Sequence, residues 1–281
     1  MDSMRFHRGL FMVNYMGNNE EIRGFHMIFD THAHYDDEQF DIDRDSLLLS
    51  MKENGIGTIV NIGANLASSE TTLELAHKYD FIYAAVGVHP SDSAELNEDN
   101  FSRLRQMTSD DRCVAVGEVG LDYYWPEPDH EIQKKWFVRQ LELAREVGLP
   151  VVIHSRDAAA DTVQILKDNN AGEIGGVVHC FSYSKEVALE CVKMGLYIGV
   201  GGVLTFKNGK KMKEVVSEVP IEKIILETDC PYLAPEPNRG KRNSSLNLPY
   251  VVKAMAEIKG ISEQEVIDIT EHNARTMYRI G

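Results

Sequence analysis

MIFDTHAH, residues 27–34, is a short apolar run that ends on two histidines, His32 and His34. The run is typical of a buried strand, and residues two apart on a strand project to the same side, so both imidazoles can bind one metal ion. Apolar packing alone would not select polar side chains at the end of a buried strand. The segment therefore predicts a strand that presents two metal ligands.

Four later segments have the same form as the first one. VAVGE, VVIH, GVVH and IILETD are apolar runs that each end on a side chain able to bind a metal. The side chains concerned are Glu118, His154, His179 and Asp229. Five such endings in one chain indicate a centre assembled from several strands, which is typical of a binuclear metallohydrolase.

Strand-like apolar runs alternate with amphipathic stretches along the whole chain. The expected strands cover residues 28–32, 56–62, 82–87, 113–118, 150–154, 175–180, 196–201 and 223–228. Helical patterns separate them, and two more helices are expected within 248–278. Eightfold strand–helix alternation predicts an α/β fold, a (β/α)8 TIM barrel with additional C-terminal helices. An open doubly wound sheet is the competing fold, but GVGG at 199–202 is not its GxGxxG phosphate fingerprint.

Barrel geometry predicts that the candidate ligands converge. Barrel enzymes place their active sites at the carboxyl ends of the strands, and all six candidates fall there. Without an ion, four histidines and two carboxylates at one end of a barrel would leave many buried polar groups unsatisfied. Glu227 shares the strand face of Asp229 and is expected either to support the ligands by hydrogen bonding or to contact the substrate. Cys180 directly follows His179, so alternation predicts that it points away from the barrel axis.

Composition sets limits on the class of protein. A chain of 281 residues with 43% hydrophobic content can bury one large core. The net charge of −15 argues against a broad basic surface that coats nucleic acid, so any polyanion must be bound locally, by ions and a few basic residues. The four cysteines lack CxxC spacing, and no stretch is long enough to span a bilayer. We expect a cytoplasmic protein without membrane contact, as a monomer or weak oligomer.

The expected domain is a metallohydrolase barrel over residues 27–281. Residues 1–26 show no core-forming pattern and precede the first strand. They are expected to be a disordered or artefactual extension.

Five motifs, in order, resemble one family. DTHAH, GEVGLDYY, VIHSRDA, HCFS and ETDCPYLAP are similar to motifs of the TatD-type metal-dependent deoxyribonucleases of the amidohydrolase superfamily. The resemblance runs from about Met27 to the C-terminus. It implies a TIM barrel with two divalent metal ions (Mg, Mn or Zn) and hydrolysis of DNA phosphodiesters, often as a 3'-5' exonuclease on single strands. Members of the family are also linked to RNA ends and to removal of D-amino acids from tRNA.

The resemblance also implies a role for each candidate ligand. In this assignment one ion is bound by His32, His34 and Asp229, the other is bound by His154 and His179, and Glu118 bridges both. Two ions about 3.5 to 4 Å apart lower the pKa of a shared water and neutralise charge on the phosphoryl group. Glu118 and Asp229 are thus the expected catalytic carboxylates, with Asp229 accepting the proton of the water.

Substrate contacts are expected at the rim of the barrel. The loop after the last strand carries the basic run Arg239, Lys241 and Arg242 followed by Asn243, and barrel enzymes often bind phosphate there. Arg239, Lys241 and Asn243 are therefore predicted to bind substrate. The family resemblance gives His89 the same role, although a helix-capping or loop-packing role is nearly as well supported.

The chain departs from the family pattern within this loop. Many members have His or Tyr where Asn238 stands, and an acidic residue followed by Pro where this chain has Ser244 and Ser245. The metal ligands are not affected by this difference, which concerns the preference for substrate at the rim.

Three functions follow from these observations. The first is metal-dependent hydrolysis of nucleic-acid phosphodiesters, as a 3'-5' exonuclease on single-stranded DNA or on RNA. The alternative is a D-aminoacyl-tRNA deacylase or another ester or amide hydrolase of the amidohydrolase type. A non-catalytic protein that binds metal and nucleic acid is disfavoured, because a purely structural metal site needs no open coordination position.

Overall fold

Eight parallel strands, hydrogen-bonded in chain order, form a nearly closed barrel in the computed structural model, which describes residues 26–281. The strands are β1 (Ile28–Ala33), β2 (Ile56–Ile62), β3 (Ile82–Val86), β4 (Cys113–Asp122), β5 (Val151–Arg156), β6 (Gly176–Val178), β7 (Tyr197–Val200) and β8 (Ile224–Leu226). The predicted TIM barrel is confirmed. The extension predicted for residues 1–26 lies, apart from His26, outside the described residues.

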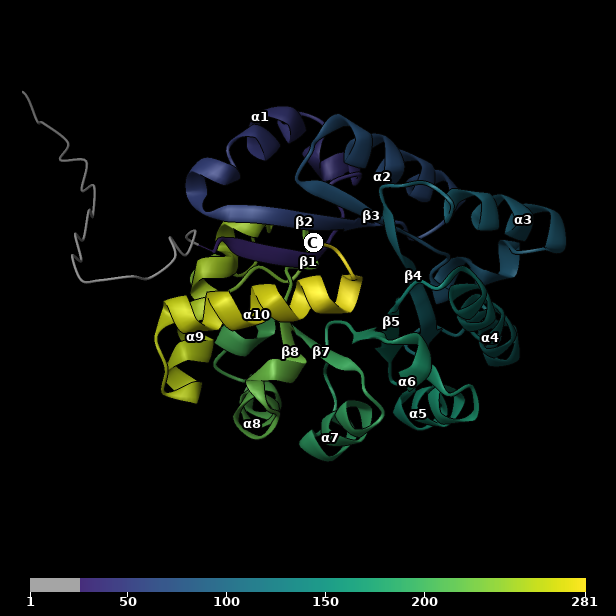
Figure 1. Cartoon of the computed structure of the whole chain (residues 1–281). Helices are drawn as coiled ribbons and strands as arrows, with labels where there is room; N and C mark the ends of the chain where they lie inside the picture. The colour runs from purple at the N-terminus through teal and green to yellow at the C-terminus, as the bar shows by residue number, and fades with distance from the viewer. Residues whose placement is uncertain (1–25) are drawn as a thin grey trace, which may run out of the picture.

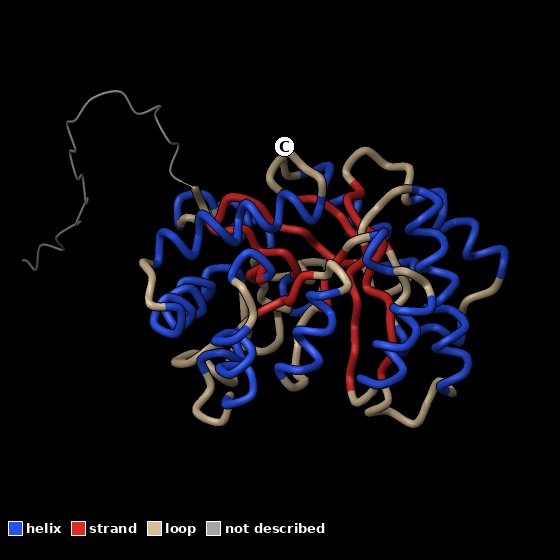
Figure 2. The backbone as a smooth tube through the Cα atoms, turned by 60° about the horizontal axis from the view of Figure 1, so that its bottom comes forward, coloured by secondary structure: helices blue, strands red, loops and turns tan. Residues whose placement is uncertain are grey.

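Helices cover the outside of the strands, as Figure 2 shows. The helices are α1 (Arg44–Leu49), α2 (Leu66–Lys78), α3 (Glu98–Met107), α4 (His130–Val147), α5 (Ala159–Asp168), α6 (Ala171–Ile174), α7 (Lys185–Lys193), α8 (Lys210–Glu218), α9 (Leu248–Lys259) and α10 (Glu263–Tyr278). Short 3-10 turns include η3 (Pro90–Glu95) and η6 (Ser245–Asn247). The two helices expected after residue 248 are therefore confirmed as α9 and α10.

Local sequence explains where several helices begin and end. Capping boxes start α2 at Asn65 and α10 at Ser262, where a polar side chain accepts a hydrogen bond from the first turn and the third helical residue bonds back. Helix α4 ends at Gly148, whose φ of 72° lies in the left-handed region that glycine adopts without strain. These signals define the segments that return the chain from one strand to the next.

The gap between β1 and β8 is closed by backbone contacts. Ala33 forms a parallel bridge with Cys230, and the N–H of His34 donates to the carbonyl of Cys230 at 2.9 Å. The N–H of Asp229 donates to the carbonyl of His32, also at 2.9 Å. The closure therefore joins the two segments that hold His32, His34 and Asp229.

The barrel interior is apolar at the end opposite the candidate ligands. There the C-terminal part of α10 packs against inward-facing strand residues, and Figure 1 shows α10 lying across β1 and β8. This inner cluster contains Phe29, Val60, Ala85, Val152, Val177 and Ile225 with Ala274, Met277 and Tyr278 of α10. The additional C-terminal helix thus fills one end of the barrel, which leaves the other end for the site.

Two of the differences between the expected and observed strand bounds change the surroundings of the candidate ligands. Strand β4 continues past Glu118 to Asp122, because Leu121 and Asp122 remain paired with β5. Strand β6 stops at Val178, before the two residues that follow it in the predicted strand. Within residues 26–281, no helix combines the length and apolar character needed to cross a membrane.

Candidate metal centre

Strand alternation turns two of the candidate ligands, His154 and His179, into the barrel. On β5, Val152 packs in the inner cluster, and His154, two residues later, faces the same side. Val177 is related to His179 in the same way, since His179 directly follows β6. Strands β1 and β4 each shift register within their length, and their candidate ligands also turn inward. The structure brings together all six predicted ligands at the carboxyl ends of the strands.

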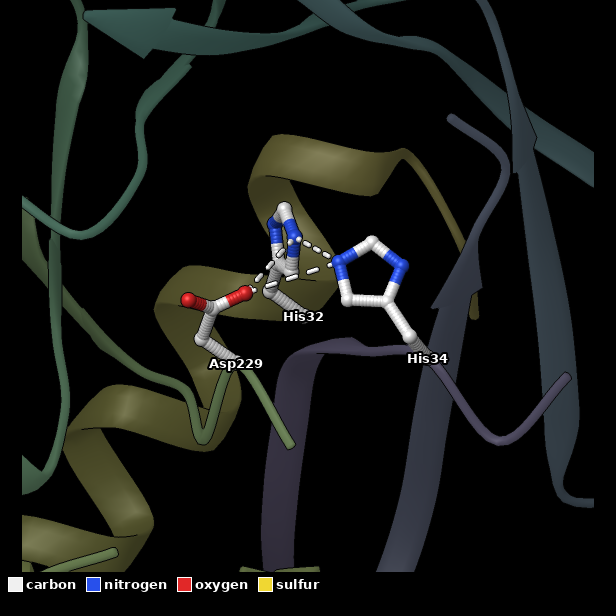
Figure 3. Close-up of side chains that lie close together, drawn as sticks. All are labelled: His32, His34 and Asp229. Carbon is white, nitrogen blue, oxygen red and sulfur yellow. Dashed lines mark hydrogen bonds and ion pairs between the residues drawn. The ribbon is translucent and has the colours of Figure 1, made fainter. Parts of the chain in front are cut away.

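One group of ligands lies where β1 meets the segment after β8. The Nε2 atoms of His32 and His34 are 3.0 Å apart, and Oδ1 of Asp229 lies 3.6 and 3.5 Å from them respectively. Figure 3 shows the two imidazoles and the carboxylate converging on one point. His32 is fully buried, whereas the side chain of Asp229 is 18% exposed and faces the cavity. Three donor atoms of this kind match the ligand preferences of a divalent metal.

Glu118 joins this group to a second one. Its Oε2 lies 3.4 Å from His32 Nε2, while its Oε1 lies 2.6 Å from His179 Nε2 and 2.7 Å from His154 Nδ1. His154 and His179 are themselves 3.1 Å apart between Nδ1 and Nε2. A single buried carboxylate therefore presents one oxygen to each histidine pair.

Partners outside the two groups orient the imidazoles. The Nδ1 of His34 lies 2.9 Å from the carbonyl oxygen of Ile62, an arrangement that places a proton on Nδ1 and leaves Nε2 free to bind a metal. The Nε2 of His154 lies 3.1 Å from Oδ2 of Asp122, which in the same way leaves Nδ1 free. Sequence analysis missed Asp122. Strand alternation from Glu118 would have found it, since residues 118, 120 and 122 share a face once β4 is known to continue.

The electrostatics of the centre favour a cation. Burial disfavours the charged form of Glu118, but the surrounding His179, His154 and His32 hold the pKa of its carboxyl well below the usual range. Burial also opposes protonation of His34 and His154, yet hydrogen bonds donated to the carboxylates of Asp229 and Asp122 raise the pKa of each imidazole to about 9. The carboxylates thus draw positive charge into the site.

A bound divalent metal ion would supply this positive charge while the imidazoles stay neutral. Metal-bound histidines must be deprotonated, so a divalent cation replaces the protons that the carboxylates otherwise attract. Nδ1 of His32 and Nδ1 of His179 are buried without a hydrogen-bond partner among the described residues, and each belongs to a ring whose other nitrogen, Nε2, faces Glu118. The donor set therefore fits divalent metal ions.

A cavity of about 450 Å³ opens beside the centre and includes His154, His179 and Asp229 in its wall. Glu227 also lines it and is buried, with Oε1 accepting the backbone N–H of Cys180 and Oε2 without a partner among the described residues. Burial raises the pKa of Glu227 to about 8. Its position next to the ligands agrees with the support expected for it, which stays a prediction.

Cys180 corrects one expectation from the sequence. It was predicted to point away from the barrel axis, but its side chain lines the cavity. The strand ends at Val178, and Cys180 has a φ of 44°, so strand alternation no longer applies to it. Within the described residues all four cysteines are free thiols, in line with the absence of a disulfide pattern.

His89 caps a turn and also faces the centre, while its contact with substrate stays a prediction. Its Nδ1 accepts the N–H of Ser91 at 3.1 Å and caps the turn η3. Its Nε2 lies 3.8 Å from Oε1 of Glu118, and its ring packs edge-on against His154 with centroids 4.3 Å apart. The cap fixes the ring so that one nitrogen faces the candidate metal centre.

Of the basic side chains in the loop after β8, two are exposed to solvent and one forms an ion pair. Arg239 and Lys241 are exposed, and the guanidinium of Arg239 lies 4.2 Å above the ring of Phe206. Arg242 instead forms a two-point ion pair with Asp43, at 2.7 and 2.6 Å. Of the three basic residues, Arg239 and Lys241 are thus the ones available to a substrate.

Asn243 differs from its sequence expectation. It is 1% exposed, and its Nδ2 donates to the carbonyls of Thr228 at 3.1 Å and Tyr232 at 2.8 Å. Its Oδ1 accepts from Ser244 and Asn247, each at 2.9 Å. The amide therefore holds the loop in place, and a direct substrate contact would have to displace one of these bonds. Burial of a loop residue depends on distant contacts, which the local sequence does not reveal.

A TIM barrel with four histidines and two carboxylates at its carboxyl end is typical of metal-dependent hydrolases. The model of the TatD related DNase family matches residues 29–279. The chain therefore belongs to the TatD-related DNase family and is a metal-dependent hydrolase.

Relatives agree with this assignment over nearly the whole barrel. The chain is 44% identical over 255 residues to the uncharacterized metal-dependent hydrolase YabD of Bacillus subtilis, covering 91% of this chain and all of the relative. It is 32% identical to the 3'-5' ssDNA/RNA exonuclease TatD of Cronobacter sakazakii, covering 89% of this chain and 97% of the relative. The crystal structure of YjjV, a TatD homologue from Escherichia coli, superposes with a TM-score of 0.85 at 30% identity, over 90% of this chain and 98% of that one.

Proposed function

We propose that this protein binds two divalent metal ions and hydrolyses phosphodiester bonds of single-stranded nucleic acid from the 3' end. The observation that carries the proposal is the division of the Glu118 carboxylate, with Oε2 facing His32 at 3.4 Å and Oε1 facing His179 at 2.6 Å. In this assignment Glu118 binds both ions. When bound, such a pair of ions supplies an activated water and neutralises the charge of a phosphate in reaction.

The ligands divide into two sets in this proposal. His32, His34 and Asp229 hold one ion, and His154 and His179 hold the other. The bond from His34 to the Ile62 carbonyl keeps the Nε2 lone pair of that ring directed at the centre, and Asp122 does the same for Nδ1 of His154. The protein thus supplies ligands that are already oriented.

Asp229 is the proposed proton acceptor. It is the more exposed of the two central carboxylates, and it faces both the histidines and the cavity in which a substrate can lie. Hydrogen bonding from His34 and the charge of nearby imidazoles outweigh burial and lower the pKa of Asp229, so it is ionised at neutral pH and able to accept a proton from water. Glu118 is enclosed and has both oxygens engaged, which suits a bridging role instead.

Two arginines support a phosphate-bearing substrate. Among the arginines of residues 26–281, Arg156 and Arg239 are the ones whose guanidinium groups make no hydrogen bond or ion pair; the others contact carboxylates or carbonyls. Arg156 lines the cavity, and Arg239 lies on the loop after β8. Free cations at this position suit a polyanion in an otherwise acidic protein. The names of relatives such as the Cronobacter exonuclease support single-stranded DNA or RNA and 3'-5' polarity.

The proposal is tested with end-labelled substrates. Metal-stripped protein is reloaded with Mg, Mn or Zn and incubated with single-stranded DNA or RNA labelled at either end, with duplex DNA, and with a D-aminoacyl-tRNA. We expect a ladder of shortened 5'-labelled products and rapid release of the 3' label as mononucleotide from single strands. Glu118→Ala, purified in parallel, controls for contaminating nucleases. Hydrolysis of the aminoacyl ester alone would contradict the proposal and favour the deacylase function.

A further inference from the structure

Two aromatic rings stand exposed at the end of β4, next to the candidate metal centre. Tyr124 and Trp125 are each 53% exposed, and their rings meet edge-on with centroids 4.8 Å apart. They lie at the mouth of the barrel, two and three residues after Asp122. Exposed aromatic pairs are unfavourable in water, and large exposed aromatic surfaces often mark a binding site.

This pair, the Tyr124–Trp125 platform, is fixed relative to the centre. Oδ1 of Asp122 accepts the backbone N–H of Tyr124 at 2.9 Å, while Oδ2 of the same carboxylate contacts His154. Gln133 holds the loop from behind, accepting from the N–H of Asp122 at 2.8 Å and donating to the carbonyls of Asp122 and Pro128, both at 2.9 Å. The side chain of Asp122 therefore links a candidate ligand to the backbone that carries the platform.

Arg156 connects the platform to the cavity. It lies opposite Asp122 in the register of β4 and β5, and its guanidinium sits 3.8 Å from the centroid of the Tyr124 ring. It lines the cavity together with His154 and His179, and it has no ion-pair partner among the described residues. A guanidinium between an aromatic surface and a metal centre can contact a backbone phosphate while the neighbouring base of the same strand stacks on the aromatic surface.

We propose that Tyr124, Trp125 and Arg156 form a stacking subsite for an unpaired nucleobase of the substrate strand. The base lies on the platform, and Arg156 contacts the backbone phosphate that leads toward the centre. This proposal rests on the proposed nuclease function and adds a reason for single-strand preference. Bases in a duplex are stacked on their neighbours and do not expose a face to a protein ring, whereas unpaired bases do.

Fluorescence offers a direct test. The chain has two tryptophans, and Trp136 is buried on α4, so Trp136→Phe leaves Trp125 as the sole reporter. This protein, loaded with metal, is titrated with a phosphorothioate oligothymidylate that resists hydrolysis and with an abasic oligonucleotide of the same length. We expect saturable quenching by the first oligonucleotide and little by the second. Equal quenching by both would overturn the proposal, because stacking requires the base.

Variants measure the contribution of the platform to binding. Replacing Tyr124 and Trp125 together with Ala should raise the KM for single-stranded DNA about 5- to 150-fold if one base stacks there. Trp125→Phe keeps a ring and should stay within about twofold of the parent, since an aromatic face is retained. Tyr250→Ala, at a residue 42% exposed on α9, is the matched control and should leave KM unchanged.

The outcomes separate this subsite from the nuclease function itself. If the parent protein degrades DNA but the double variant keeps its KM, the stacking subsite is wrong and the nuclease function stands. If the parent hydrolyses neither DNA nor bis(4-nitrophenyl) phosphate with any metal, the proposed function fails. Melting curves of each variant confirm folding, which exposed side chains are not expected to disturb.

Discussion

The two sides of the candidate metal centre are built differently. On the β1–β8 side, the residues behind the ligands form a buried polar network: Asp30 accepts from Thr228 Oγ1 at 2.7 Å and from Ser245 Oγ at 2.6 Å, and Tyr35 contacts Ser245 at 2.8 Å. All four side chains are at most 2% exposed. On the β4–β5 side, the carboxylate of Asp122 supports His154, and the nearby Tyr124 and Trp125 are exposed aromatics.

This difference assigns separate tasks to the two sides. A buried, fully hydrogen-bonded network rigidifies its surroundings, so the β1–β8 side fixes the geometry of His32, His34 and Asp229. The β4–β5 side keeps polar and aromatic groups free at the surface, where a substrate can reach them. Ser245 belongs to the buried network.

Removing Glu118 should have the largest effect, because this residue joins both sides. Glu118→Ala is expected to lower turnover more than about 10²-fold, comparable to the loss of a central electrostatic group. Steady-state nuclease assays and metal analysis check this, and the variant should also bind less metal. Glu70→Ala, an exposed carboxylate on α2 that pairs with Arg103, is the control. Near-normal activity with unchanged metal content would contradict the bridging assignment.

Asp122→Asn should weaken metal binding on the β4–β5 side and leave metal binding on the β1–β8 side unchanged. The amide presents to Nε2 of His154 either its NH2 group or an oxygen that accepts more weakly than a carboxylate. The proton of the ring is then held less firmly on Nε2, and Nδ1 is less consistently available as a metal ligand. Loss of such a partner typically costs about 10- to 100-fold in metal affinity or activity. Titration with Mn or Zn followed by calorimetry measures the effect on one of the two sites. Asp110→Asn removes a similar contact, 2.9 Å to the surface residue His77, and should change nothing at the centre.

Tyr35→Phe should lower the stability of the protein, because Tyr35 belongs to the hydrogen-bond network behind the β1–β8 ligands. The hydroxyl accepts the N–H of Ser245 at 2.9 Å and contacts its Oγ, so its removal leaves buried polar groups without a partner. Such a loss costs about 1 to 3 kcal/mol, which should appear as a lower midpoint of urea unfolding. Tyr250→Phe, at an exposed position, should leave the midpoint unchanged. If both variants unfold alike, the network does not stabilise this side.

Sequence reasoning predicted the barrel and the gathering of six polar side chains, because alternation and strand ends are local properties. It failed where the backbone left the regular pattern. Asp122 was overlooked because the polar Glu118 was taken as the end of its strand, although pairing with β5 carries β4 four residues further. Cys180 was misplaced because its strand ends earlier than its apolar run.

Long-range contacts were also out of reach of the sequence. Ser245 meets Asp30, 215 residues away in the chain, and no local pattern links them. Arg242 and Arg239 are equivalent in the sequence, yet an ion pair with Asp43 commits one of them and leaves the other free. Which member of a basic run can bind substrate is decided by its partners in the fold.

The smallest expected effect concerns Arg239 and Lys241, in the loop after β8. Arg239→Ala with Lys241→Ala should raise the KM for oligonucleotides while metal content stays unchanged, because these exposed side chains lie outside the ligand groups. If each contacts one phosphate, the slope of log Kd against log salt should fall by about 0.7 per contact, or about 1.4 in total. Arg103→Ala, whose guanidinium pairs with Glu70 on the outer helices, is the control for loss of a surface charge. A double variant with the parent KM and salt slope would mean that this loop is only solvated. Phosphate binding would then fall to Arg156, and the β4–β5 side would bind the substrate strand on its own.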